Sequence, residues 1–126
     1  MRSRSRIAVL AVALAAMAAG CTPKESHIEV RPSQLLGLWQ RSNTQEYWRY
    51  TENATGVTWD EADDVHEDES NLTFSWTLDE DRLTHVFTGM EGNQAVPKVY
   101  TITAISNTSM RWRDDYSMEY SFTRVE

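Results

Sequence analysis

Histidines, one cysteine and a cluster of acids are the side chains of this sequence that could bind a metal or catalyse a reaction. Seven acidic residues and His66 fall within the ten residues from Asp60 to Glu69. An EF-hand calcium loop needs acids at its first, third and fifth positions, but a loop that begins at Asp60 has Ala62 as its third residue. The three histidines are spread along the chain with no metal-ligand spacing. The sequence therefore predicts no metal site and no cofactor.

The acidic segment Asp60–Glu69 has two interpretations that do not involve a metal. Because its acids have no defined spacing, it can be a solvated loop between two strands. It can equally be an acidic surface that contacts a basic partner.

Motifs for nucleophilic catalysis and phosphate binding are absent from the sequence. It contains no G-x-S-x-G, no H-E-x-x-H and no phosphate loop. His85 shares the alternation of Leu83 and Phe87, so we expect it to point into the fold as a hydrogen-bonded core residue. We predict a protein that is not an enzyme.

The single cysteine, Cys21, follows a segment that reads as an export signal. Three arginines among residues 2–6 precede an apolar run over residues 7–19, which is shorter than the roughly 20 residues that span a bilayer. A basic start, an apolar centre and a small-residue exit are typical of a secretory signal. The exit, Ala18-Ala19-Gly20-Cys21, resembles a bacterial lipobox. That resemblance implies a signal peptide over residues 1–20, cleavage before Cys21 and lipid attachment to its sulfur.

Lipidation at Cys21 predicts a bacterial cell-envelope protein anchored to a membrane by its N-terminus, on the periplasmic or the surface face. We expect residues 21–34 to be the lipidated N-terminus and a tether, and residues 35–126 to be one domain. Cleavage removes three arginines and no acid, so the formal charge changes from −7 to −10. An acidic chain of this kind is not expected to bind nucleic acid.

From Gly37 onward, short β-rich segments alternate with turn residues, and no helical period is sustained. Their spacing of about 11 residues is typical of an antiparallel sandwich or barrel. A meander of this size closes most simply into an eight-stranded up-and-down barrel, which leaves no open edge. We therefore predict an all-β fold with strands at residues 38–42, 46–51, 56–60, 72–78, 82–88, 98–105, 109–113 and 118–125.

Alternation within these segments places large aromatic side chains on one face. Closing the barrel brings ten of them inside: Trp39, Trp48, Tyr50, Phe74, Trp76, Phe87, Tyr100, Trp112, Tyr120 and Phe122.

Two features of this pattern resemble a known family. Gly37-Leu38-Trp39 on the first strand is similar to the G-x-W of lipocalins, and Arg124 on the last strand to the arginine that packs across that tryptophan. From Leu35 to Val125 the chain resembles the lipocalin-like domains of small bacterial lipoproteins. The resemblance implies a calycin-type barrel in which Gly37, Trp39 and Arg124 close one end through a cation–π contact.

Two functions fit such a barrel. The first is binding of a small hydrophobic or amphipathic ligand, with these candidate binding residues: Trp48, Tyr50, Phe74, Trp76, Tyr100, Trp112 and Tyr120. The alternative is a packed barrel that acts on an envelope protein partner, as an interaction, assembly or inhibitor module, through its loops and acidic surface.

Overall fold

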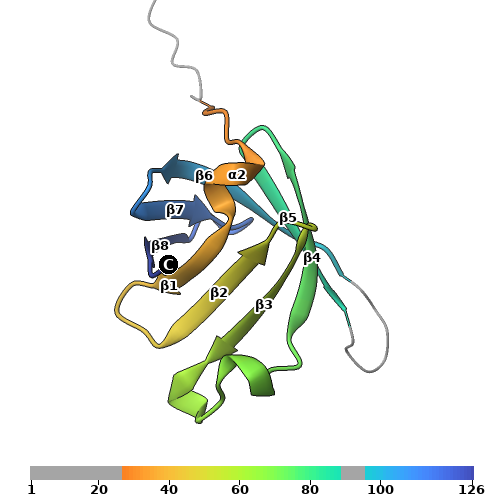
Figure 1. Ribbon diagram of the computed structural model, residues 1–126. Coiled ribbons are helices and arrows are strands. Elements are labelled where there is room, and N and C mark those ends of the chain that lie inside the picture. Colours follow the sequence, from red (N-terminus) through yellow and green to blue (C-terminus); the bar gives the residue numbers. More distant parts are fainter. Residues whose placement is uncertain (1–26, 89–95) are drawn as a thin grey trace, which may run out of the picture.

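The computed structural model describes residues 27–88 and 96–126, which form a closed, eight-stranded antiparallel barrel (Figure 1). Each strand pairs with the next along the chain, and β8 returns to pair with β1 through Trp39 opposite Arg124. The strands are β1 (Gly37–Arg41), β2 (Glu46–Thr51), β3 (Thr55–Asp60), β4 (Thr73–Asp79), β5 (Arg82–Thr88), β6 (Lys98–Ile105), β7 (Ser109–Arg113) and β8 (Glu119–Arg124).

The predicted all-β barrel is therefore confirmed, and each strand begins and ends within about one residue of its expected position. The strand ends agree because tight turns fix where each strand stops. These turns contain residues with the left-handed backbone that hairpins need, among them Asn43, Glu80 and Ser117. The described residues contain no helix with the length and apolar character needed to cross a membrane. The predicted signal peptide and Cys21 lie outside the described residues.

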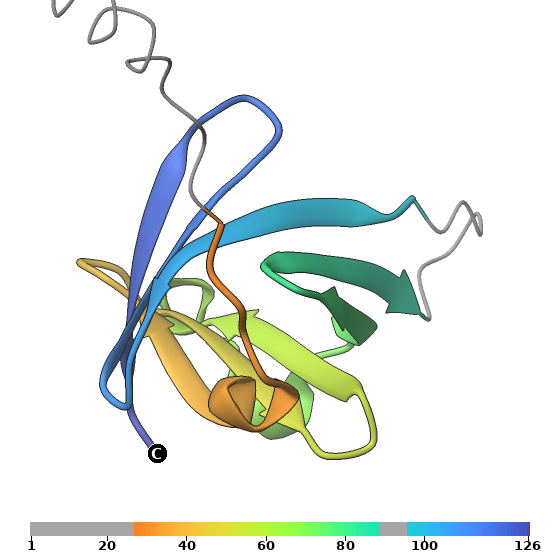
Figure 2. The ribbon, with the colours of Figure 1, turned by 90° about the horizontal axis from the view of Figure 1, so that it is seen from above.

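A short helix, α2 (Pro32–Leu35), covers one end of the barrel, which we call the closed end. Proline at its first turn suits a helix start, since proline has no backbone N–H to leave unpaired there. Leu35 is fully buried, and its carbonyl accepts a hydrogen bond of 2.8 Å from the indole Nε1 of Trp39. Figure 2 shows α2 and the preceding residues in orange, with the β7–β8 connection, in blue, on the opposite side of the molecule.

The packed part of the chain begins before residue 35, where we expected the domain to start. Val30 is 5% exposed, and its backbone N–H donates to the carbonyl of Glu80 in the β4–β5 turn. His27 lies 2.8 Å from the carboxylate of Asp81. Residues 27–31, expected in the tether, thus lie against the barrel, because the apolar side chains at 28 and 30 can join its core.

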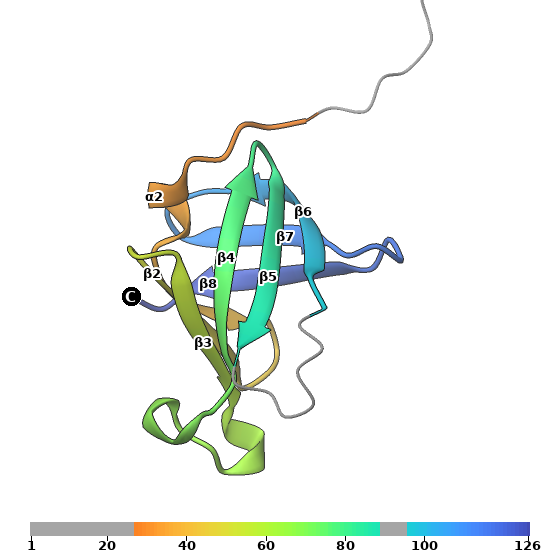
Figure 3. The ribbon, with the colours of Figure 1, turned by 90° about the vertical axis from the view of Figure 1, so that its right-hand side faces the viewer.

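The acidic segment between β3 and β4 contains two 3₁₀ helices, η2 (Glu61–Asp63) and η3 (Glu67–Glu69), seen below β3 in Figure 3. They fold back onto the outer face of the barrel. There Glu67 forms a two-pronged ion pair with Arg49 on β2, and Trp59 is stacked on Tyr47 at 5.4 Å. Trp59 is only 5% exposed although it points away from the barrel interior. The segment is thus a folded cover for a second aromatic cluster as well as an acidic surface.

Candidate functional site

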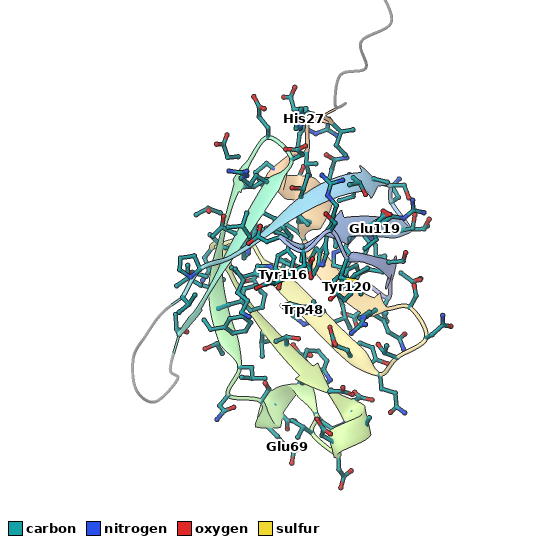
Figure 4. All side chains as sticks on the ribbon, turned by 180° about the vertical axis from the view of Figure 1, so that it is seen from behind. His27, Trp48, Glu69, Tyr116, Glu119 and Tyr120 are labelled. Carbon is teal, nitrogen blue, oxygen red and sulfur yellow. The ribbon has the colours of Figure 1, made fainter. Side chains whose placement is uncertain are left out.

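A cavity of about 430 Å³ opens at the end of the barrel opposite α2, which we call the open end. It lies between the first residues of β2 and β6 and the β7–β8 connection. Three of its lining residues, Trp48, Tyr116 and Tyr120, are labelled in Figure 4. The aromatic lining consists of Trp48, Tyr100, Trp112, Tyr116, Tyr120 and Phe122, and the charged lining of Glu46, Lys98, Asp114 and Asp115.

The seven candidate binding residues divide into two groups by depth. Trp48, Tyr100, Trp112 and Tyr120 line the cavity. Tyr50, Phe74 and Trp76 point inward as expected but are 1–6% exposed and are not part of the lining. The barrel is therefore filled at its closed end and hollow at its open end.

The filled half is an interlocked set of rings. Tyr50 packs edge-on against Phe74 and Trp76, with ring centroids 5.5 and 5.8 Å apart. The ring of Phe74 lies directly over Gly56 on β3, where any Cβ atom would overlap it. Edge-on aromatic pairs of this kind add about 0.5–1.5 kcal/mol beyond the burial of their area. We call this layer, which lies beneath the rings that line the cavity, the floor.

His85 lies within the floor, and it is fully buried. Its ring is stacked on Trp48 at 5.1 Å, and the rings of Phe74, Tyr100 and Trp112 complete an aromatic enclosure. Its Nε2 atom lies 2.8 Å from the hydroxyl of Tyr50, whereas its Nδ1 atom has no hydrogen-bond partner among the residues that the structure describes. The expectation of an inward histidine is confirmed, but only one of its two nitrogens is hydrogen-bonded.

Hydrogen-bond counting favours one tautomer of His85. If the Tyr50 hydroxyl donates to Nε2, only the Nδ1–H donor is left without a partner. If Nε2–H donates to Tyr50 instead, both Nδ1 and the tyrosine hydroxyl hydrogen are left unpaired, and each unmet buried group destabilises the fold. Burial raises the pKa of Tyr50 well above 10 and lowers the pKa of His85 from 6.5 to about 3. Both side chains are therefore neutral at pH 7.

The carboxylates at the cavity are held in place by hydrogen bonds. Asp114 accepts backbone N–H groups of Tyr116 and Met118 through Oδ1, at 2.8 and 3.0 Å, and the Tyr120 hydroxyl through Oδ2 at 3.3 Å. The backbone N–H of Met118 is the largest of the effects that lower the pKa of Asp114, so this side chain is ionised at pH 7. Glu46 accepts the indole N–H of Trp48 at 2.7 Å.

These carboxylates produce a negative potential that reaches into the cavity. The pKa of Tyr100 is raised chiefly because the hydroxyl is partly buried, and further by Tyr120, Asp114, Glu46 and Asp115. Each of these groups disfavours a negative charge on the hydroxyl oxygen of Tyr100.

The three residues that the resemblance assigned to barrel closure meet at the closed end. The guanidinium of Arg124 lies 4.2 Å from the centre of the Trp39 ring, and it donates to the carbonyls of Leu36 and Gln34. Gly37 has a φ of 120°, and a Cβ atom there would overlap Arg124. Glycine is thus the residue type that lets the arginine reach across the tryptophan.

Sequence reasoning missed the charged residues of the cavity. Glu46 begins a strand, and Asp114 and Asp115 belong to a connection in which acids are ordinary turn residues, so their types carried no signal for a binding site. Lys98 has the same strand alternation as Tyr100, which could have placed it at the cavity. Among the residues that the structure describes, no group of three or more His, Cys, Asp or Glu side chains is placed to hold a metal ion.

Comparison with known proteins gives one match. A family model described as a lipocalin-like domain matches residues 27–112, which include the first six strands, all but the last residue of β7 and most of the cavity lining. Neither a curated protein nor a solved structure matches the chain.

Proposed function

Since the chain belongs to the lipocalin-like domain family, we propose that it binds a small amphipathic molecule, without transforming it, in the cavity at the open end of its barrel. A lipocalin-like barrel suggests small-ligand binding in general, and the cavity is the observation that supports it for this chain. Its volume of about 430 Å³ is in the range of small-molecule sites, which are mostly apolar with a few placed polar groups.

The cavity also bears on the alternative of a packed interaction module. A barrel filled from end to end would favour that function, whereas this barrel is filled only around Tyr50, Phe74 and Trp76. The rings of Tyr100 and Trp112 are stacked 4.6 Å apart beside the cavity and offer a flat apolar surface to a ligand. These features favour ligand binding over a role carried by the loops alone.

A pair of matched tyrosine variants tests the binding site. Tyr100 is stacked on Trp112 at the cavity, and Tyr47 is stacked on Trp59 on the outer face. We expect a panel of fatty acids, alkylamines and flat aromatic compounds to include one that quenches the fluorescence of Trp48 and Trp112. Tyr100→Ala should weaken that binding at least tenfold, and Tyr47→Ala should leave it unchanged. An equal effect of both variants, or a folded protein that responds to no compound, contradicts the proposal.

We further propose that the barrel is exported and anchored to a membrane of the bacterial envelope by a lipid on Cys21. The supporting observations are the basic, apolar and small-residue order of residues 1–20 and the position of the only cysteine. The described chain begins at His27, beside Asp81 at the closed end, so an anchor on Cys21 joins the barrel at the end opposite the cavity. Cys21→Ser should release the protein from membranes into the soluble fraction, and a variant that stays membrane-bound contradicts the anchor.

A further inference from the structure

The cavity combines carboxylates with aromatic faces, which are the two groups that attract an organic cation. We propose that its ligand carries an ammonium group on an apolar body, an inference that rests on the proposed binding function. The apolar body would lie along the rings of Trp48 and Tyr100, and the ammonium group near the carboxylates at the opening.

Charge is the first support for this ligand class. Among the described residues, three carboxylates, those of Glu46, Asp114 and Asp115, line the cavity together with one ammonium group, that of Lys98. The carboxylates come from two sides of the opening, since Glu46 begins β2 and the aspartates follow β7. A cation that enters is attracted by the aspartates on one side and more weakly by Glu46 on the other, because Arg41 pairs with Glu46, whereas an anion is repelled by the aspartates.

Aromatic faces are the second support. Six aromatic side chains line the cavity, and the negative face of an aromatic ring attracts a cation that lies within about 6 Å of its centre. Trp48 places a ring next to a carboxylate. Its indole N–H donates to Glu46 at 2.7 Å, and its ring lines the cavity. Rings and carboxylates placed together recognise ammonium groups in many proteins, since the rings accept the methyl or methylene groups that surround the charge.

The protein already holds one of its own cations in this way at the same opening. The guanidinium of Arg41 lies 4.7 Å from the centre of the Tyr120 ring and 3.2 Å from a carboxylate oxygen of Glu46. Tyr120 and Glu46 both line the cavity. Because that guanidinium already pairs with Glu46, the ligand's ammonium group is assigned to the side of the opening formed by Asp114 and Asp115.

The potential inside the cavity agrees with this assignment. Asp114, Glu46 and Asp115 all disfavour ionisation of the Tyr100 hydroxyl, which shows that their negative charge is felt at the wall of the cavity. A fatty acid or other anionic amphiphile would meet the same repulsion. The positive charge of Lys98 opposes this negative potential, so replacing Lys98 with a neutral residue should strengthen the binding of a cation.

Three amphiphiles with the same dodecyl chain test the ligand class on the full-length protein. Dodecyltrimethylammonium, dodecyl maltoside and dodecyl sulfate share the dodecyl chain and carry a cationic, a neutral and an anionic headgroup, and each can be titrated calorimetrically below its micelle concentration. We expect the cationic compound to bind at least tenfold more tightly than the neutral one, and the anionic compound to bind most weakly.

Charge variants separate the cavity from the overall charge of the protein. Asp115→Asn should weaken the cationic compound roughly threefold to tenfold, as expected for the loss of one nearby charge in a partly solvated site. Lys98→Gln should strengthen its binding by a similar factor. Glu52→Gln is the matched control, because it removes one negative charge at the β2–β3 turn, which lies at the closed end. It should have no effect.

The outcomes distinguish this inference from the function on which it rests. Equal affinity for the three compounds, or a preference for the anion, overturns the ammonium ligand and leaves small-ligand binding in place. If Glu52→Gln loses as much affinity for the cationic compound as Asp115→Asn does, the inference is also overturned, because the net charge of the protein would then explain the preference. Failure of all three compounds to bind the folded protein also overturns the ammonium ligand, and small-ligand binding is contradicted as well if the panel of fatty acids, alkylamines and flat aromatic compounds fails too.

Discussion

Acid should unfold this barrel through His85. The side chain is fully buried, and burial lowers its pKa from 6.5 to about 3. The unfolded chain therefore binds a proton at this residue between pH 6.5 and pH 3, and the folded chain does not. By linkage, the free energy of unfolding falls as the pH drops below 6.5, and the loss levels off below pH 3.

The size of the effect follows from the two pKa values. The full difference corresponds to about 5 kcal/mol, of which about 2 kcal/mol is lost by pH 5 and about 3 kcal/mol by pH 4. Since small domains are stable by about 5–15 kcal/mol in total, this loss is a large share of the stability of the barrel.

Urea unfolding, followed by tryptophan fluorescence at pH 7, 6, 5 and 4, measures this loss in the wild type and in His85→Phe. The variant removes the hydrogen-bond partner of the Tyr50 hydroxyl at every pH, so its free energy of unfolding at pH 7 is lower than that of the wild type. Its further decline to pH 5 should be smaller than that of the wild type by about 2 kcal/mol. His66→Phe, at an exposed histidine of the acidic segment, is the control and should decline like the wild type.

Parallel declines of the wild type and His85→Phe would refute this reasoning. They would mean that the folded protein protonates His85 as readily as the unfolded chain does. The physical explanation would then be that the faces of Trp48 and Phe74, which lie 5.1 and 4.7 Å from the imidazole, stabilise its cation enough to offset burial.

Three substitutions test the packing, each followed by urea unfolding. Trp39→Ala should lower the free energy of unfolding by about 3–5 kcal/mol, because it empties a fully buried position and removes the ring under Arg124; a change below 1 kcal/mol would contradict its role in closure. Gly56→Ala should lower it by about 1–3 kcal/mol, because the new methyl group overlaps the ring of Phe74; a neutral effect would mean that the floor is loosely packed. Trp59→Ala should also destabilise by about 3–5 kcal/mol but leave amphiphile affinity unchanged, since its ring lies under the acidic segment on the outer face; altered affinity would show that the two faces are coupled.

The fold could be predicted almost completely from the sequence because its two main signals are local. Alternation of apolar and polar residues defined the strands, and turn residues separated them. Closure was predicted from the resemblance of Gly37, Trp39 and Arg124 to the lipocalin pattern, and these three residues do meet at the closed end. The burial of Val30 was not predicted, because Ile28 and Val30 are only two alternating apolar residues, too few to establish a period that places the segment against the barrel.

The site was predicted only in part, because alternation reports the face of a strand and not the depth along the barrel. Tyr50 and Trp48 alternate alike on β2, yet the first is part of the floor and the second lines the cavity. Trp59 has the opposite alternation and is nevertheless buried, since the acidic segment folds back over it. Both outcomes depend on contacts between residues far apart in the sequence.

The division of this barrel into a filled and a hollow half follows from its size. Its strands are five to eight residues long, so each has only about two to four side chains that point inward. A domain this small buries too little surface to stay folded around a cavity that runs its full length. Rings packed around Phe74 and His85 at the closed end supply stability, and those at the open end are left free to contact a ligand. A substitution that deepens the cavity into the floor should therefore destabilise the protein, whereas one at the opening should change affinity alone.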